Sequence, residues 1–461
     1  MPPTSAAPPG HGTAPPIAPQ RVPLLGHLPS MVRDPFTFLS SLPGSGDLVE
    51  VRLGPARAIV VCTPELTRHV LLDDRTFDKG GLFFDRLREV LGDGLGTCPH
   101  SRHRRKRRLS QPAFHKARMP GYADVMTEHI TDSVRSWRDR QVLDDVYVEM
   151  MRITSRVTLA NLFSSSLPPG VSHARLLNDI TTVFDGWYWR MLTPPPLDRL
   201  PTPGNRRYQR ANARLRRDVH AIVTDRRASI AHATGSADHS DLLSALLTAS
   251  DTEGASPALS DTEIVDLMVT FLLGGTETTA TTLAWALHLL AHHPDVERAL
   301  HTEVDAVLVG GPATRAELPR LELTGRVITE TLRIHSPTWI LTRTTTTDTE
   351  LGGYRIPQGT TIVFSPYLLH RRADLHHDPD RFDPDRWLPE RNPPTSDSFI
   401  PFGSGARTCI GDTFAITQAT LALATIASRW TLRPVPGPAV TAAKSAVSHP
   451  RDLRMRINAR R

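Results

Sequence analysis

One long helical pattern constrains the fold of this chain more than any other feature. It begins at a capping box, in which Ser260 is followed three residues later by Glu263, and it continues without proline until Pro294. Apolar residues recur along it at spacings of three and four, which gives one apolar face (Ile264, Leu267, Met268, Phe271, Leu272). At about 1.5 Å per residue, such a helix crosses a whole domain.

The rest of the chain is mainly helical in pattern, with a minor β portion. Short strand patterns occur at 48–53 and 58–62, and a second β signal covers 349–366. Residues 1–22 are rich in proline and alanine and have no periodicity that could build a core, so we expect a disordered lead-in. The sequence therefore predicts one large, mainly α domain over residues 23–461.

Composition excludes several classes of protein. The chain has 461 residues, and the 39% that are hydrophobic support a large core. Its three cysteines (Cys62, Cys98, Cys409) include no close pair, which argues against a disulfide framework or a cysteine-rich zinc site and indicates a reducing compartment. No apolar run reaches the roughly 18 residues of a membrane helix, and the N-terminus lacks a signal-peptide pattern. We expect a cytoplasmic protein with no membrane partner.

Two adjacent glycines, Gly274 and Gly275, lie in the middle of the long helical pattern. Each costs about 1 kcal/mol relative to alanine, and small residues let another group approach the backbone closely. The neighbouring Glu277 and Thr278 supply a carboxylate and a hydroxyl that can relay protons. The alternative is a packing notch beside a solvated glutamate. Taken alone, the motif favours neither interpretation.

Cys409 follows a glycine-rich turn and precedes an apolar, proline-free helical pattern at 410–430. It therefore stands at a helix N-terminus, beside Arg407, and both features favour a thiolate over a thiol. Such a thiolate suits a nucleophile or a metal ligand. In the loop of cysteine-dependent phosphatases the cysteine comes before the glycines and the arginine, which is the reverse of the order here. A merely buried cysteine would leave Gly403, Gly405 and Arg407 without a reason.

The spacing Phe402-x-x-Gly405-x-Arg407-x-Cys409-x-Gly411 resembles, at every defined position, the haem-binding loop of the cytochrome P-450 family. Three further motifs occur in the order that this family has. They are Gly274-Gly275-x-Glu277-Thr278, Glu330-x-x-Arg333 and Phe382-Asp-Pro-Asp-Arg386-Trp387. A lone Glu-x-x-Arg is commonplace, but four motifs in order cover the chain from residue 23 to its end. The resemblance implies a single haem-thiolate monooxygenase fold of the soluble bacterial kind.

The resemblance also implies roles for individual residues. Cys409 would be the thiolate ligand of a haem b iron, and its electron donation favours O–O cleavage. Glu277 and Thr278 match the family's catalytic acid–alcohol pair, which delivers protons to dioxygen. The remaining cofactor-binding residues implied are His103, Arg107, Arg343, Phe402 and Arg407. A structural ion-pair cluster is implied for Glu330, Arg333 and Arg386.

A run of basic residues at 102–108 would otherwise suggest a nucleic-acid patch. It has no interleaved aromatic residues, and two members, His103 and Arg107, match inward-facing propionate ligands, so we expect no nucleic-acid partner. The outward members (Arg104, Arg105, Arg108) are expected to meet an acidic electron-transfer protein. Since the chain ends too soon after Cys409 for a fused flavin reductase, the expected partners are a separate ferredoxin and ferredoxin reductase.

Four longer segments, 96–126, 197–208, 349–361 and 411–430, resemble actinobacterial sesquiterpene oxygenases. This implies hydroxylation of a methyl group, and further oxidation to the aldehyde, of a cyclic sesquiterpene such as pentalenene in antibiotic biosynthesis. An apolar pocket without charge pairing suits a hydrocarbon. The pocket residues implied by family position are Phe83, Phe184, Met268, Phe271, Leu272, Gly275, Trp339 and Ile340. The alternative is that these aromatic residues are ordinary core, which for any single one of them is the likelier role.

Other functions remain compatible with a haem loop. The substrate could be another apolar molecule, such as a fatty acid or a macrolide. A haem-thiolate isomerase or peroxygenase commonly lacks the acid–alcohol pair, so Glu277 and Thr278 count against it. A non-catalytic haem-binding protein is a further alternative, but no output domain accompanies the haem motifs and the proton relay would have no use.

Overall fold

The computed structural model describes residues 14–164, 167–192, 200–232, 241–249 and 258–460. The chain divides into two compact units, which are treated separately below. The first unit comprises residues 1–84, 340–379 and 395–408, and the second comprises 85–339, 380–394 and 409–461. The expected mainly α fold with a minor β portion is confirmed.

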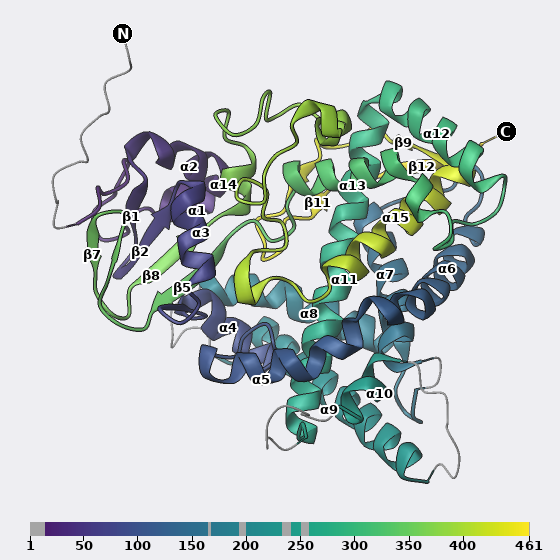
Figure 1. The fold of residues 1–461 in the computed structure, drawn as a ribbon, viewed down its shortest axis with the longest axis horizontal. Coiled ribbons are helices and arrows are strands. Elements are labelled where there is room, and N and C mark those ends of the chain that lie inside the picture. Colours follow the sequence, from purple (N-terminus) through teal and green to yellow (C-terminus); the bar gives the residue numbers. More distant parts are fainter. Residues whose placement is uncertain (1–13, 165–166, 193–199, 233–240, 250–257, 461) are drawn as a thin grey trace. The chain divides into compact units, whose positions relative to one another are not determined.

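The first unit is built on a five-stranded sheet with the strand order β1-β2-β8-β5-β3 (Figure 1). Strands β1 and β2 form an antiparallel hairpin, whereas β2 pairs with β8 in parallel. The strands are β1 (Leu48–Leu53), β2 (Ala56–Val61), β3 (Phe77–Asp78), β5 (Leu341–Thr345) and β8 (Thr361–Phe364), beside a separate hairpin of β6 (Thr349–Leu351) and β7 (Tyr354–Ile356). The helices that lie within this unit are α1 (Leu28–Arg33), α2 (Pro35–Ser41), α3 (Pro64–Leu72) and α14 (Pro366–His370).

The predicted disordered lead-in needs a partial correction. Residues 1–13 lie outside the described residues. Residues 14–22 are placed along β1, where the Ala18 amide donates to the Glu50 carbonyl at 2.9 Å and the Glu50 amide donates to the Pro16 carbonyl at 2.7 Å. Ala18 is buried by this contact. The free edge of β1 thus supplies backbone partners, and a composition-based prediction has no access to such partners.

The second unit is helical and surrounds one central helix, α11 (Asp261–His292). The predicted capping box is present at its start, and most of its 32 residues are buried. Helix α11 packs against α7, α13 and α15 (Figure 1). The helices of this unit are α5 (His100–Ser110), α6 (Met119–Arg135), α7 (Val146–Phe163), α8 (His173–Leu192), α9 (Pro203–His232), α10 (Leu242–Leu247), α12 (Pro294–Leu308), α13 (Glu322–Ile334) and α15 (Asp412–Arg429). Helix α4 (Gly81–Leu91) spans the boundary between the units.

Short strands complete the second unit. A three-stranded sheet has the order β4-β12-β9, and β10 pairs with β11. Their bounds are β4 (Val142–Leu143), β9 (Trp430–Pro434), β10 (Thr441–Ala442), β11 (Pro450–Arg451) and β12 (Met455–Ala459).

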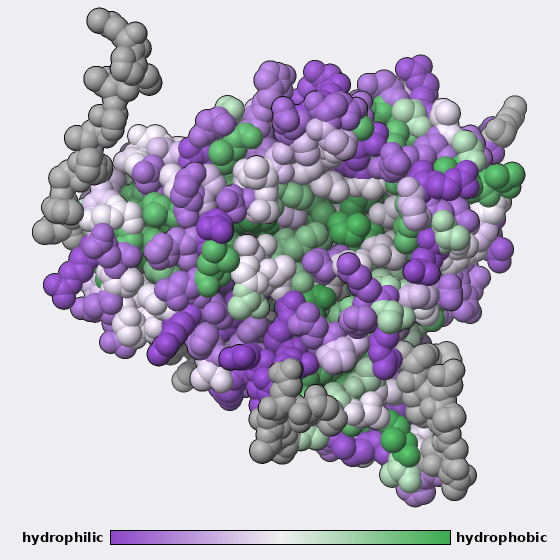
Figure 2. Space-filling model, viewed as in Figure 1, coloured by the Kyte–Doolittle hydropathy of each residue, from purple (hydrophilic) through white to green (hydrophobic). Residues whose placement is uncertain are grey.

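On the visible face, apolar side chains gather in separate groups among polar ones (Figure 2). No helix in the described part of the chain is long and apolar enough to span a membrane.

Candidate haem and oxygen site

The glycine-rich turn before Cys409 has the geometry that requires glycine. Gly403 and Gly405 have φ values of 71° and 69°, in the left-handed region. A Cβ atom at Gly405 would lie 2.6 Å from the Leu71 carbonyl oxygen, so only glycine lets the turn approach α3 this closely. Phe402, at the start of the turn, is half-buried.

Arg407, in the same turn, is held by two carboxylates of the first unit. Its guanidinium donates to Asp74 Oδ2 and to Asp78 Oδ1, each at 2.8 Å, and its side chain is 1% exposed. Sequence reasoning missed both acids because they are 333 and 329 residues away from Arg407 in the chain. The two ion pairs fix the orientation of Arg407 before any ligand binds.

Arg343 on β5 is a second buried guanidinium, and it is less well compensated. It donates to the Thr342 carbonyl at 2.9 Å and lies over the rings of Phe84 and Phe364, at 5.7 and 5.2 Å from their centroids. Burial, and then the nearby Arg407, lower its pKa to about 10. Among the described residues no carboxylate forms an ion pair with it. A buried cation without such a bond fits an anionic group like a haem propionate.

Cys409 differs from the other two cysteines in being exposed. It precedes the first turn of α15, as predicted, and Arg107 of α5 interacts electrostatically with both Cys409 and Asp412. A helix N-terminus and a neighbouring guanidinium stabilise a thiolate. By contrast, burial raises the pKa of the Cys62 thiol to about 12. Of the three thiols, Cys409 is therefore the one placed to act as a ligand.

Helix α5 presents His103 and Arg107 as predicted for i, i+4 neighbours: His103 is buried and Arg107 is half-buried. Burial lowers the pKa of Arg107, and the charges of Cys409 and Asp412 oppose that effect. The second unit thus supplies an imidazole and a guanidinium, and the first unit supplies the two guanidiniums of Arg343 and Arg407; each is of the type that binds a carboxylate.

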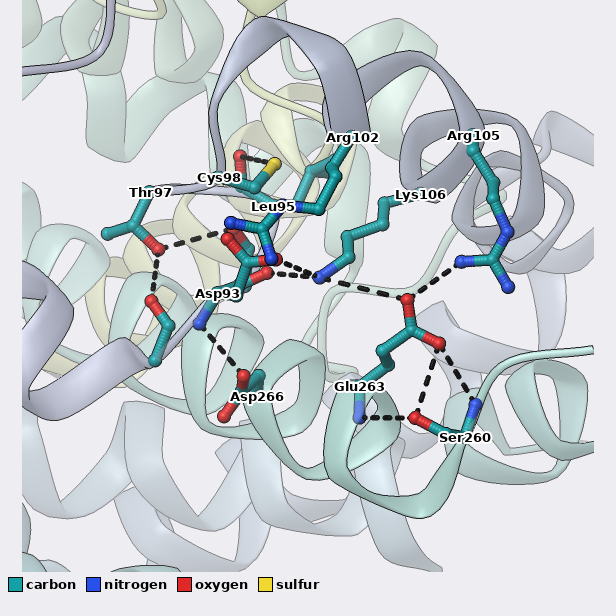
Figure 3. A network of polar contacts seen from close by, with 12 residues as sticks. Asp93, Leu95, Thr97, Cys98, Arg102, Arg105, Lys106, Ser260, Glu263 and Asp266 are labelled. Carbon is teal, nitrogen blue, oxygen red and sulfur yellow. Dashed lines mark hydrogen bonds and ion pairs between the residues drawn. The ribbon is translucent and has the colours of Figure 1, made fainter.

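The outward basic residues of α5 need a correction. Arg105, expected to meet an electron-transfer partner, instead donates to Glu263 Oε1 at 2.7 Å (Figure 3). Lys106 is buried, with Nζ 2.8 Å from Asp93 Oδ2, and Arg102 reaches the same carboxylate oxygen at 2.8 Å. Arg105 thus ties α5 to the capping box of α11, whereas Arg102 and Lys106 tie α5 to Asp93. Sequence reasoning missed the contact with α11 because Glu263 is remote from Arg105 in the chain. Arg104 is exposed, as expected.

The two glycines of α11 have different surroundings. Gly274 is exposed in an otherwise buried helix, and a Cβ atom there would meet nothing within 4 Å. Gly275 packs against α7, since its Cβ atom would lie 3.2 Å from Thr158 Cγ2. The motif therefore combines an open position at Gly274 with a packing notch at Gly275. Gly275, predicted to line the substrate pocket, is partly exposed, and its Cβ direction faces α7.

Glu277 and Thr278 are neighbours in different environments. The Thr278 hydroxyl is partly exposed and donates to the Gly274 carbonyl at 2.6 Å. Glu277 is 3% exposed, so the solvated-glutamate alternative is excluded. Its Oε1 accepts a bond from the Tyr147 hydroxyl at 3.0 Å. Burial raises the pKa of Glu277 to about 8, against the effect of the Tyr147 bond, and Asp185 raises it further. A neutral carboxylic acid beside an open hydroxyl can hold and release a proton.

The expected ion-pair cluster comes together on α13. Glu330 and Arg333 are both fully buried and form two bonds, at 2.8 and 2.9 Å. Arg386 donates to Glu330 Oε1 at 3.3 Å, and the Trp387 indole donates to Oε2 at 3.0 Å. Each carboxylate oxygen thus accepts several bonds, which offsets the cost of burying the charges.

The residues predicted for the substrate pocket fall into two groups. Phe83, Phe184 and Ile340 are half-buried, so part of each side chain is open to contact. Met268, Phe271, Leu272 and Trp339 are buried. Met268 and Leu272 have 0% exposure and belong to the core. Phe271 packs edge-on against Phe114, with ring centroids 5.0 Å apart, and the Trp339 indole donates to the Ser445 carbonyl at 2.8 Å. Met268 and Leu272 were therefore wrongly assigned to the pocket, since no atom of either is available.

Comparison with known proteins decides the family. The cytochrome P450 family model matches residues 15–452. The chain belongs to the cytochrome P450 family. A solved structure, the cytochrome P450DA heme domain, superimposes with a TM-score of 0.85 at 28% identity, covering 97% of this chain and 98% of that one. The expected fold, the oxidoreductase class and the thiolate-ligated haem cofactor are thereby confirmed.

Several relatives are similar over nearly their whole length. Pentalenene oxygenase of Streptomyces avermitilis is 45% identical over 446 residues, covering 96% of this chain and 97% of the relative. Cyclooctat-9-en-7-ol 5-monooxygenase of Streptomyces melanosporofaciens is 45% identical over 436 residues, covering 94% and 93%. Cyclooctatin synthase of the same organism is 46% identical over 423 residues, covering 91% and 90%. The expected resemblance to pentalenene oxygenase is confirmed.

Proposed function

We propose that this P450 is a monooxygenase that hydroxylates a methyl carbon of a cyclic sesquiterpene hydrocarbon, such as pentalenene, and oxidises the alcohol further to the aldehyde in antibiotic biosynthesis. The observation that carries the proposal is the similarity to three relatives whose names contain pentalenene, cyclooctat-9-en-7-ol or cyclooctatin, which are terpenoids. The identity is 45–46% over nine-tenths or more of each chain. In the first step, dioxygen, two electrons and two protons convert R–CH3 to R–CH2OH and water.

The chemistry supplied by the bound haem is the reduction of dioxygen and the transfer of one oxygen atom to the C–H bond. The chain's own residues prepare that chemistry. When haem is bound, Cys409 would hold the iron as a thiolate, and His103, Arg107, Arg343 and Arg407 would hold the carboxylates of the cofactor.

Proton supply falls to Glu277 and Thr278. Glu277 is buried and has a pKa of about 8, so it carries its proton at neutral pH. The Thr278 hydroxyl donates to the Gly274 carbonyl, and its oxygen can still accept a hydrogen bond from a proton donor. A Cβ atom at Gly274 would meet nothing within 4 Å, so there is room for dioxygen beside this residue.

An apolar substrate agrees with the side chains that remain partly open. Phe83, Phe184 and Ile340 carry no charge, and burying a charged substrate against them would be costly. A fatty acid would need a cation for its carboxylate. We infer that electrons come from a ferredoxin and its reductase in the cytoplasm, with the exposed Arg104 available to an acidic partner.

A binding titration of the haem-loaded protein tests the substrate. Pentalenene and a related cyclic sesquiterpene are compared with a fatty acid and a macrolide, and the shift of the haem to high spin is followed. We expect the hydrocarbons to give the shift because they displace water by filling apolar space. Tight shifts with the fatty acid or the macrolide, and none with any sesquiterpene, would contradict the proposed substrate and leave the haem chemistry in place.

A further inference from the structure

The bond between Tyr147 and Glu277 joins two buried side chains that are 130 residues apart in the sequence. Tyr147 lies in the first turn of α7, and its hydroxyl donates to Glu277 Oε1 at 3.0 Å. The two residues are 8% and 3% exposed. The other carboxyl oxygen, Oε2, is buried and has no hydrogen-bond partner among the described residues. The carboxyl group is thus held at one oxygen and free at the other.

The same face of α7 also fixes the backbone next to Glu277. Thr154 and Thr158 lie seven and eleven residues after Tyr147, which places all three on one side of the helix. The Thr154 hydroxyl donates to the Thr276 carbonyl at 3.0 Å, and the Thr158 hydroxyl donates to the Gly275 carbonyl at 3.3 Å. Since α7 holds both the main chain and the side chain, the position of the carboxyl group is strongly determined.

The ring of Tyr147 is itself held in place. The His449 imidazole stacks on it, with centroids 4.1 Å apart and an angle of 9° between the planes. Burial lowers the pKa of His449 to about 4, so the imidazole is neutral at physiological pH. The preceding residue is anchored back to α11, because the Trp285 indole donates to the Ser448 carbonyl at 2.7 Å. The stack leaves the Tyr147 hydroxyl little freedom to turn away from Glu277.

We propose that Tyr147 is a positioning residue for Glu277: its hydroxyl holds Oε1 and leaves Oε2 as the atom that carries and releases the proton. This inference rests on the proposed monooxygenase function only for the use made of that proton. Among the described residues, the titratable groups that interact with the pair are Asp145 at the N-cap of α7 and Asp185 of α8, which act electrostatically, and His449, which stacks on Tyr147. None is a cation at neutral pH, so Tyr147 is the group that orients the acid.

The matched test compares Tyr147→Phe with Tyr122→Phe. Tyr122 is also buried and also donates one hydrogen bond, to the Ala113 carbonyl at 2.8 Å, but it lies on α6. In haem-loaded protein, the infrared carbonyl band of a protonated carboxyl group is followed against pH, and Glu277→Gln identifies which band belongs to Glu277. In the wild type we expect the band to disappear with a midpoint near 8.

In Tyr147→Phe the band should change frequency, and its midpoint should rise by about 0.5–1 pH unit, because the lost bond stabilised the carboxylate. Tyr122→Phe should leave both unchanged. With terpenoid turnover, the pH profile of coupling between electrons and product should move in the same direction. His449→Leu, which removes the stack and keeps the hydroxyl, should also change the band frequency if Tyr147→Phe fails to fold.

The possible outcomes separate the two proposals. If Glu277→Gln removes no band, or if Tyr147→Phe behaves like Tyr122→Phe, the positioning role is overturned. When Tyr147→Phe does not fold, an unchanged band in His449→Leu overturns it as well. If the band shifts as expected but wild-type protein oxidises no terpenoid, the positioning role stands and the proposed substrate fails.

Discussion

Cys409 owes its expected chemistry to its surroundings more than to its residue type. Cys62 and Cys98 are buried, whereas Cys409 is exposed, precedes α15 and lies near Arg107. We expect Cys409→Ser to lose the far-red-shifted Soret band that reduced protein with carbon monoxide gives for a thiolate ligand. Cys98→Ser serves as the control and should keep it. An unaltered carbon monoxide spectrum in Cys409→Ser would remove this residue from the iron.

Glu277 should make the stability of the protein depend on pH. Its pKa is raised from 4.5 to about 8 by burial, so the folded state favours the neutral acid. The stability that this group contributes is therefore complete below pH 4.5 and is lost as the pH rises toward 8, with a slope of up to about 1.4 kcal/mol per pH unit. Glu277→Gln removes this dependence, so the variant should gain on the wild type as the pH rises.

Urea unfolding of the wild type and Glu277→Gln at about pH 5 and about pH 9 measures the effect. The exposed Glu322→Gln on α13 is the control, and it should leave the difference between the two pH values unchanged. Parallel pH profiles for the wild type and Glu277→Gln would mean that Glu277 does not titrate in this range.

At the scale of elements, α5 carries a prediction about the cofactor. Arg107 is half-buried one turn from His103 and interacts with Cys409 and Asp412, whereas Arg104 is exposed. Arg107→Ala should therefore loosen haem more than Arg104→Ala does, by roughly the 1.5–3 kcal/mol of a charge-assisted hydrogen bond. Transfer of haem to apomyoglobin measures the two rates. Equal rates would contradict the inward orientation of Arg107.

Element-level reasoning succeeded where the information was local. The capping box of α11, its apolar period and the helix after Cys409 depend on residues a few positions apart, and all were predictable. The ion pair of Arg105 could not be predicted in this way, because its partner Glu263 is 158 residues away in the chain. A repeating basic pattern shows which residues share a face of a helix, but only tertiary packing decides which of them meets an acid.

At the scale of the whole molecule, the sequence motifs identify the family, and the packing of α7 against α11 decides how the acid works. The resemblance placed a carboxyl group at Glu277, but nothing in the local sequence indicates that Tyr147 holds it or that it is fully buried. Likewise, Met268 and Leu272 were assigned to the pocket but are buried in the core. The apolar periodicity of a helix does not distinguish a face that contacts substrate from one that packs in the core.

The number of successive oxidations depends on whether the alcohol product binds to the protein again. A sesquiterpene alcohol differs from the hydrocarbon by one oxygen atom, so it stays mostly apolar and loses little of its tendency to bind apolar side chains. We therefore expect the alcohol to rebind and to be oxidised to the aldehyde. Its hydroxyl must find a partner in the site, and this should make the second binding step weaker than the first.

Turnover of a cyclic sesquiterpene with ferredoxin and its reductase, under isotopically labelled dioxygen, tests this sequence of steps. The alcohol should appear first with one labelled oxygen atom, and the aldehyde should follow. Unlabelled alcohol added during the reaction should compete with the labelled alcohol for the enzyme. Part of the aldehyde should then derive from the added alcohol, because the intermediate exchanges with solution. If supplied alcohol is never consumed while hydrocarbon is hydroxylated, the reaction of this protein ends at the alcohol and a different enzyme must make the aldehyde.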